Sequence, residues 1–180
     1  MAALRIRAYG ESCLREQSVP VREINDEVRR LIHDMADTMY AAKGVGLAAS
    51  QIGVNARLFV SDTDYVRDEN GDTANRHLKV FVNPEITWES PEDESLAEGC
   101  LSVPGIEGEV YRSVSVKLRY LDENGAEHER LVEGMEARCV QHEIDHVNGV
   151  LFIDRLPILR RRLLAGKLNS LKRNLASSAK

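Results

Sequence analysis

The spacing of hydrophobic residues predicts three helices in the chain. In residues 25–42, apolar side chains recur every three or four positions, which is the period of an amphipathic helix, and Asn25 stands where a helix N-cap is expected. The same period returns from Gly134 to about Val147, and again after Pro157 in a leucine-rich final segment. Each of these segments is therefore predicted to be a helix that buries one face.

The middle of the chain has the pattern of β-strands. β-Branched and aromatic residues are concentrated in residues 57–61, 78–88 and 110–121. A turn sequence at 122–125 joins the last of these segments to a further strand over 127–133, as in a β-hairpin. This part of the chain is therefore predicted to form antiparallel strands.

The order of these elements predicts an α+β fold. Helix, strands, helix and helix follow one another without regular βαβ alternation, so antiparallel or mixed β-sheets are expected to pack around the helix at 134–147. A basic C-terminal helix is expected at about 157–180, and the polar segment 62–77 is expected to turn at Asn70-Gly71. With 180 residues, the chain is expected to be one catalytic domain, 1–180.

Composition and charge exclude several classes of protein. The chain is 43% hydrophobic and 29% charged, which is typical of a soluble globular protein and not of a disordered one. Neither a secretion signal nor a membrane-spanning segment is recognisable, so a cytoplasmic location without a membrane partner is expected. Its three cysteines, an odd number, favour thiols or metal ligands over a disulfide framework.

A metal-binding pattern lies in the second predicted helix, in Gln141-His-Glu-Ile-Asp-His146. Residues four apart on a helix lie roughly 40° apart around its axis, so the imidazoles of His142 and His146 can reach one metal ion. Glu143 is offset by roughly 100°, which suits a general base acting on water better than a third ligand. This His-Glu-x-x-His motif therefore predicts a metal-dependent hydrolase.

Such a catalytic site needs a third protein ligand. Residues 147–180 contain no His, Cys or Glu, so the ligand is sought upstream, where thiolates are the softest donors. Cys139 would lie roughly 10 Å from His146 along the helix axis, and Cys13 lies in an unpatterned stretch, so both are expected to pack rather than to ligate. Cys100, in a glycine-flanked loop between β segments, is therefore predicted to be the third ligand.

Three motifs together resemble those of the peptide deformylase family, in the same order and over nearly the whole chain. They are Gly44-Val-Gly-Leu-Ala-Ala-Ser-Gln51, Glu98-Gly-Cys-Leu-Ser102 and Gln141-His-Glu-Ile-Asp-His146. The resemblance implies an enzyme that removes the formyl group from new polypeptides that begin with N-formylmethionine. It also implies Cys100, His142 and His146 as metal ligands, with water in the fourth position and Glu143 as the proton shuttle.

Further residue roles follow from the same resemblance. The side-chain amide of Gln51 and the backbone N–H of Leu101 can stabilise the oxyanion that forms when metal-bound water attacks the formyl carbon. Glu98 and Asp145 are expected to orient the ligands or the cysteine loop, although ordinary surface carboxylates are the alternative. The resemblance places the methionine pocket around Val45, Met135, Arg138, Cys139 and the ring of His142. The predicted substrate-binding residues are Gly44, Val45, Gly46, Met135, Arg138 and Cys139. Arg138 departs from the apolar residue expected there, so either its stem lines the pocket while its head reaches water, or the pocket is altered.

The predicted ligands decide neither which metal is bound nor between deformylation and two alternative functions. One thiolate and two imidazoles suit iron(II), zinc, nickel or cobalt, and the resemblance favours one iron(II) per chain. Another amidohydrolase or a peptidase would share this chemistry, but a peptidase would release peptide fragments rather than formate. A nucleic-acid or ribosome-binding module with a purely structural metal site is the other alternative. Glu143 and an open fourth position argue against it.

The C-terminal segment carries its own charge pattern. The chain has a net charge of −5, yet residues 155–180 contain eight Lys or Arg and no acid. Leu159, Leu163 and Leu168 are expected to anchor one face of a helix and to leave a basic surface. That surface comprises Arg160, Arg161, Arg162, Lys167, Lys172 and Arg173. Bacterial deformylases can dock on the ribosome through such a helix, so salt-dependent binding to ribosomal RNA near the exit tunnel is expected; a merely solvated helix face is the alternative.

Overall fold

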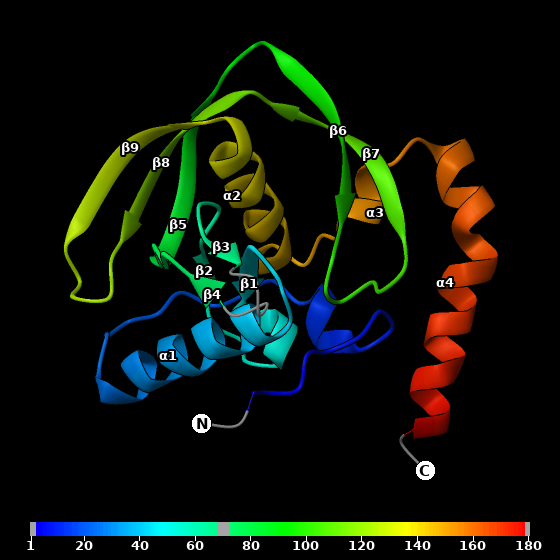
Figure 1. Ribbon diagram of the computed structural model, residues 1–180, viewed down its shortest axis with the longest axis horizontal. Helices are drawn as coiled ribbons and strands as arrows, with labels where there is room; N and C mark the ends of the chain where they lie inside the picture. The colour runs from blue at the N-terminus through cyan, green and yellow to red at the C-terminus, as the bar shows by residue number, and fades with distance from the viewer. Residues whose placement is uncertain (1–2, 68–72, 179–180) are drawn as a thin grey trace.

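The structure, a computed structural model, describes residues 3–67 and 73–178 (Figure 1). Its principal helices are α1 (Asp26–Ala41), α2 (Gly134–Val147) and α4 (Ile158–Ser178), with the short helix α3 (Phe152–Arg155) between the last two. Two 3₁₀ turns, η1 (Ser12–Arg15) and η2 (Ala49–Ile52), complete the helical elements of the described residues. The three helices predicted from apolar spacing are therefore present, and the α+β fold is confirmed.

A five-stranded antiparallel sheet forms the centre of the molecule. Its strands, in spatial order, are β1 (Gly46–Ala48), β2 (Leu58–Ser61), β5 (Lys79–Glu89), β8 (Ser115–Leu121) and β9 (Glu127–Glu133). Directly paired Phe59 and Phe81 stack with their ring centroids 4.6 Å apart. Such cross-strand aromatic pairs stabilise a sheet beyond the area that they bury.

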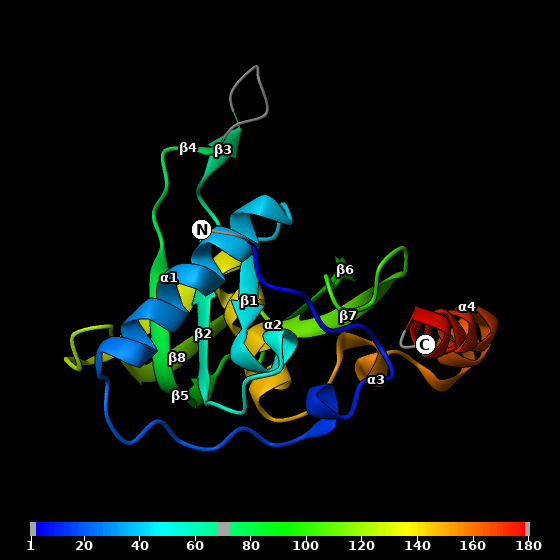
Figure 2. The same cartoon turned by 90° about the horizontal axis from the view of Figure 1, so that it is seen from below.

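Helices α1 and α2 cover opposite faces of this sheet, and Figure 2 shows α1 lying across its strands. Because successive strand residues point to opposite faces, Leu58 and Val60 pack with α1 whereas Phe59 packs with α2. Helix α1 begins as predicted, since the side chain of Asn25 accepts hydrogen bonds from the first free backbone N–H groups. The core thus holds α2 rigidly against the sheet.

A second sheet lies on the other side of α2 and consists of two strands, β6 (Asp93–Gly99) and β7 (Glu107–Ser113). The predicted single strand over 110–121 is therefore wrong, because β7 and β8 belong to different sheets and the chain changes sheet at Val114. Buried and exposed residues alternate along both strands, but the alternation is interrupted at Arg112 and Ser113, which are consecutive and both buried. This interruption lies at the boundary between β7 and β8, which β-propensity alone does not reveal.

A small antiparallel pair projects from the large sheet. It is formed by β3 (Val66–Arg67) and β4 (Thr73–Ala74). The predicted turn at Asn70-Gly71 lies outside the described residues.

Helix α4 lies at the edge of the molecule, beside β7 and α3 (Figures 1 and 2). Leu164, Leu168 and Leu171 contact a core cluster that includes Tyr9, Leu14 and Phe152. The predicted anchors Leu159 and Leu163 are wrong, because their side chains are 70% and 69% exposed. Positions 164, 168 and 171 share one face at helical spacing, and 159 and 163 lie outside that face. Within the described residues, no helix is both long and apolar enough to cross a membrane.

Candidate metal centre

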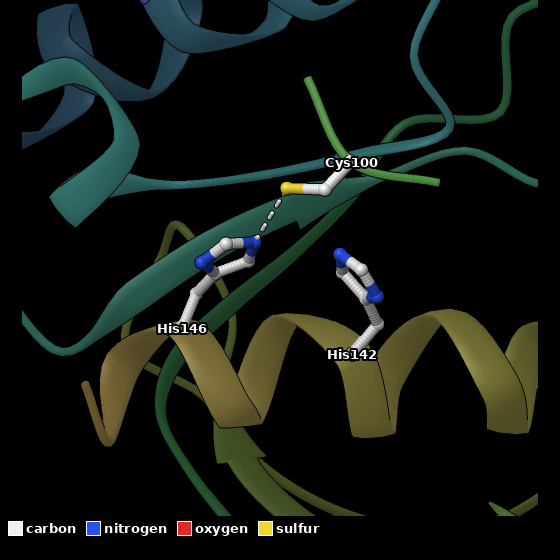
Figure 3. Close-up of side chains that lie close together, drawn as sticks. All are labelled: Cys100, His142 and His146. Carbon is white, nitrogen blue, oxygen red and sulfur yellow. Dashed lines mark hydrogen bonds between the residues drawn. The ribbon is translucent and has the colours of Figure 1, made fainter. Parts of the chain in front are cut away.

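Two histidines project from the same face of α2 (Figure 3). The opposite face of the helix carries Ala137, Val140 and Ile144, which pack on the large sheet. The rings of His142 and His146 lie with their centroids 5.0 Å apart and their planes at 67°. Packing of the apolar face therefore fixes the direction in which both imidazoles point.

Cys100 supplies a third donor from a separate segment, immediately after β6. Its Sγ atom lies 3.2 Å from Nε2 of His146, and the thiol points toward the two rings in Figure 3. One ligand atom each of Cys100, His142 and His146 lies within 4.8 Å of the others. A thiolate and two imidazoles converging in this way are a donor set suited to zinc or iron. The residues present therefore fit a divalent metal ion.

Glu98 sets the orientation of His142. The Nδ1 atom of that ring lies 3.0 Å from Oε2 of Glu98, so the other ring nitrogen is turned toward Cys100 and His146. Burial raises the pKa of Glu98, but hydrogen bonds from Arg112 and His142 outweigh it and hold the pKa at about 2. The carboxylate therefore stays ionised and keeps one tautomer of the imidazole in place.

Arg112 joins the two acidic residues expected to support the site. Its guanidinium bonds both oxygens of Glu98, at 2.7 and 2.9 Å, and Oδ2 of Asp145, at 2.8 Å. Arg155 bonds the same Asp145 carboxylate from α3. Sequence reasoning missed Arg112, although an arginine at an inward position of an alternating strand was a signal for a buried ion pair.

Glu143 is buried beside the cluster. Burial raises its pKa to about 7, and its Oε2 atom is buried without a hydrogen-bond partner among the described residues. Buried polar atoms are rarely left unpaired, so this oxygen is available for a ligand or a water molecule. A carboxyl group with a pKa near neutral can both accept and donate a proton.

Gly46, the first residue of β1, allows the backbone to lie close to α2. The left-handed residue after α1 is Lys43, with φ of 62°, and the backbone N–H of Gly44 ends the helix by donating to the carbonyl oxygen of Met39 at 2.9 Å. A Cβ atom on Gly46 would lie 2.9 Å from Sγ of Cys139 and closer still to the carboxylate of Glu143. The bare backbone here therefore leaves room for the Glu143 side chain.

Gln51 is held in η2 with its amide group directed at the cysteine loop. Its Oε1 accepts the N–H of Ala48 at 2.8 Å, which fixes the amide so that Nε2 points the other way. Nε2 lies 3.2 Å from Oγ of Ser102 and 3.5 Å from Sγ of Cys100. A fixed amide donor therefore stands next to the candidate metal ligands.

A cavity of about 790 Å³ opens at this cluster. All six predicted substrate-binding residues line it: Gly44, Val45, Gly46, Met135, Arg138 and Cys139. Gln51, Glu98, Cys100, Leu101, His142 and Glu143 line it as well. Leu96 and Ile106 are further apolar lining residues that sequence reasoning missed, because β6 and the segment before β7 were not recognised as pocket walls.

Arg138 does not behave as expected from the sequence. Its side chain is buried, and its guanidinium bonds Glu98 and two backbone carbonyl groups of β6 and β7. Of the two alternatives for Arg138, the one in which its head reaches water is therefore wrong. The charge is neutralised inside the protein instead.

The other two cysteines lie outside the cluster. Cys139 is buried beside it, where burial raises the pKa of its thiol and Sγ lies 3.5 Å from the carbonyl oxygen of Val45. Cys13 is partly buried against the core cluster under α4.

Comparison with known proteins agrees with this geometry. Residues 3–162 match the family described as polypeptide deformylase. A peptide deformylase of Rhizorhabdus wittichii is 48% identical over 160 residues, which cover 89% of this chain and 90% of that protein. One of Zymomonas mobilis is 46% identical over 168 residues, which cover 93% and 94%. The crystal structure of a peptide deformylase from Legionella pneumophila has a TM-score of 0.83 at 43% identity, covering 97% of this chain and 98% of that one. Because these matches extend over most of the chain and include the segments of the candidate metal centre, the chain belongs to the polypeptide deformylase family of metal-dependent amide hydrolases.

Proposed function

We propose that this chain removes the N-formyl group from the formylmethionine of nascent polypeptides and releases formate. The observation that carries the proposal is the position of the three-donor cluster. Cys100 and His142 line the same cavity as Glu143 and Gln51, so ligands, proton shuttle and amide donor surround one space. That space is large enough for the end of a peptide.

A divalent cation held by Cys100, His142 and His146 supplies the Lewis acid, because it lowers the pKa of water and polarises the formyl carbonyl group. We assign iron(II), one ion per chain, on the resemblance to the family. Zinc, nickel and cobalt suit the same donors. Metal analysis after anaerobic purification tests the assignment, and a chain isolated with another metal at full occupancy would contradict it.

Glu143 moves the protons in this proposal. Its carboxylate accepts a proton from the water whose oxygen bonds to the formyl carbon, and it passes that proton to the nitrogen of the breaking C–N bond. One water molecule is consumed, and formate and a free amino terminus are released. A pKa raised to about 7 by burial suits a group that must act as base and then as acid.

Gln51 and the cysteine loop stabilise the negative charge that develops on the formyl oxygen. The amide of Gln51 is already fixed by its bond to Ala48, so its Nε2 donor needs no reorganisation. The backbone N–H of Leu101, adjacent to the ligand Cys100, is the second donor. Each such donor is worth on the order of a hundredfold in rate.

The apolar part of the cavity receives the methionine side chain. Val45, Leu96 and Met135 line it and are partly exposed, at 43%, 38% and 57%. Exposed apolar side chains at a cavity are typical of a binding surface. The buried stem of Arg138 completes this wall.

Formate release from a formyl-methionyl peptide tests the function directly. The assay uses the chain loaded in turn with iron(II), nickel, cobalt and zinc, and the matched acetyl-methionyl peptide is the control. We expect formate from the first peptide and no acetate from the second. Internal peptide fragments would instead indicate a peptidase. A tightly bound metal without exchangeable water or turnover would indicate a structural site.

Ribosomal RNA near the exit tunnel is the second partner that we propose, bound through α4 in the cytoplasm. Arg160, Arg162 and Lys167 are exposed on this helix. Removal of the whole helix is a poor test, because Leu164, Leu168 and Leu171 belong to a core cluster. Replacing the three basic residues with alanine leaves that core intact.

Ribosome co-sedimentation at low and high salt measures this contribution. The triple alanine variant should bind more weakly, with a log–log salt slope smaller by about 2 to 3, since each phosphate contact contributes about 0.7 to 0.9. Replacement of three exposed arginines before and on α1, namely Arg22, Arg29 and Arg30, is the matched control. Equal binding by both variants would mean that α4 presents only a solvated basic face.

A further inference from the structure

Arg138 makes three hydrogen bonds from a buried position. Its NH1 group donates to Oε1 of Glu98 at 2.7 Å and to the carbonyl oxygen of Val110 at 3.0 Å, and NH2 donates to the carbonyl oxygen of Glu94 at 2.6 Å. Only 7% of the residue is exposed. A guanidinium group is suited to this task, because its planar donors can engage several acceptors in fixed directions.

These bonds join the two segments that carry the candidate metal ligands. Arg138 stands four residues before His142, so it projects from the same face of α2 one turn earlier. Its acceptors lie on β6 and β7, and β6 ends at Gly99, directly before Cys100. The distance between Cys100 and the histidines therefore depends on how β6 docks on α2.

Arg138 also determines which partner each carboxylate oxygen of Glu98 contacts. Oε1 of Glu98 accepts hydrogen bonds from Arg112 and Arg138, and Oε2 accepts one from Arg112 and faces Nδ1 of His142. With Oε1 occupied by two cations, the carboxylate is held with Oε2 toward the imidazole. Arg112 spans the same gap in the opposite direction, from β7 to Asp145 of α2.

We propose that Arg138 is a positioning residue for the metal centre, which fastens α2 to the β6–β7 hairpin and fixes Glu98 against His142. The inference rests on the proposed function, since it concerns the same metal site. Stability alone does not test it, because removing one partner of a buried ion pair destabilises a fold whether or not that residue orients a ligand. Metal affinity does test it, because partners that orient a ligand commonly change affinity by about 10- to 100-fold.

The experiment compares Arg138→Met, Arg138→Lys and a matched control, Arg130→Met, in the full chain. Arg130 also ties a strand to α2, through a 2.7 Å ion pair with Glu136, but it makes no contact with Glu98. Cobalt(II) affinity is measured by competition with a chromophoric chelator, together with the thiolate-to-cobalt charge-transfer band. Urea unfolding of each variant is measured in parallel.

We expect Arg138→Met to weaken cobalt binding about 10- to 100-fold and to shift the charge-transfer band. The cobalt affinity of Arg138→Lys should lie between those of the wild type and Arg138→Met, because an ammonium group retains the charge without the forked geometry. Arg130→Met should bind cobalt like the wild type. Should Arg138→Met fail to fold, Arg138→Lys decides: affinity weakened about threefold or more supports the role, and an unchanged affinity overturns it.

Cobalt affinity and band position equal to those of the wild type in a folded Arg138→Met would also overturn the inference. A wild-type chain that binds cobalt tightly but releases no formate would refute the proposed function and leave this inference standing. The two failures are therefore distinguishable.

Discussion

Replacing Gly46 with alanine should lower kcat for formate release about 100-fold while leaving the metal content unchanged. Gly46 begins β1 and is buried against α2. A methyl group there would lie 2.9 Å from Sγ of Cys139 and closer still to the carboxylate of Glu143, whereas ordinary contact begins at 3.4 Å. Both neighbours are on a helix that is packed on the sheet, so the Glu143 side chain must give way.

The magnitude follows from the required displacement. To reach ordinary contact, the carboxylate must shift by about 1 Å, and misplacement of that size commonly costs about 100-fold in rate. This corresponds to about 2.7 kcal/mol in activation free energy. No atom of Cys100, His142 or His146 is among the three nearest to the added methyl group, so the ligand set is not displaced directly.

The assay measures kcat for formate release and metal content on the same preparation. Gly99→Ala is the matched control, because Gly99 adjoins the proposed ligand Cys100 but an added methyl group would meet Glu107 at an ordinary 3.7 Å. A wild-type kcat in Gly46→Ala would refute the reasoning that the reaction depends on the space that Gly46 leaves for the Glu143 side chain. Loss of metal in that variant would show that the effect arises elsewhere.

Three further substitutions separate the roles proposed in the site. Glu143→Gln should keep the metal and lose about 10²- to 10⁴-fold in turnover, because the ligands stay while the proton shuttle is removed; near-normal turnover would contradict this role. Gln51→Ala should lower kcat about 100-fold with little change in metal content, and an unchanged rate would remove Gln51 from the reaction. Cys100→Ser should weaken metal binding because a hydroxyl replaces a soft thiolate, whereas Cys139→Ser should not. Equal metal loss in both variants would contradict the assignment of Cys100, rather than Cys139, as the metal ligand.

Elements with a strong local signal were predictable from the sequence. The apolar spacing and the Asn25 cap predicted α1, and the same periodicity predicted α2 with both histidines on one face. Strand β6 gave no such signal. Its sequence Asp93–Gly99 is polar and lacks β-branched residues, and it is a strand because β7 pairs with it along its whole length. Pairing between segments overrides local propensity here.

The charged groups around the site were the least predictable part. Glu98 was expected to support the ligands, but its partners Arg112 and Arg138 come from β7 and α2, 14 and 40 positions away. A charged residue in a sequence is by default on the surface, and only the fold shows that these three charges are buried together. The same reason explains why the sequence left two alternatives open for the head of Arg138.

Asp154 connects three elements at the base of α4. Its carboxylate pairs with Arg15 of η1, accepts the N–H of Leu151 at 2.9 Å, and lies 3.0 Å from Arg161 of α4. Hydrogen bonds to a charged group are worth about 1.5 to 3 kcal/mol. Asp154→Asn should therefore lower the free energy of unfolding by about that amount at pH 7.

The stabilisation by Asp154 should disappear in acid. Burial raises the pKa of Asp154, but the bonds from Arg15 and Leu151 outweigh it and hold the pKa below its ordinary value of 3.8. The folded state therefore binds the proton less readily than the unfolded chain, so the contribution is complete above that value and is lost as the pH falls below it. Urea unfolding of wild type and Asp154→Asn should show a clear difference in stability at pH 7 that shrinks toward pH 3. A difference of equal size at both pH values would mean that the carboxylate charge is not what holds α4 in place.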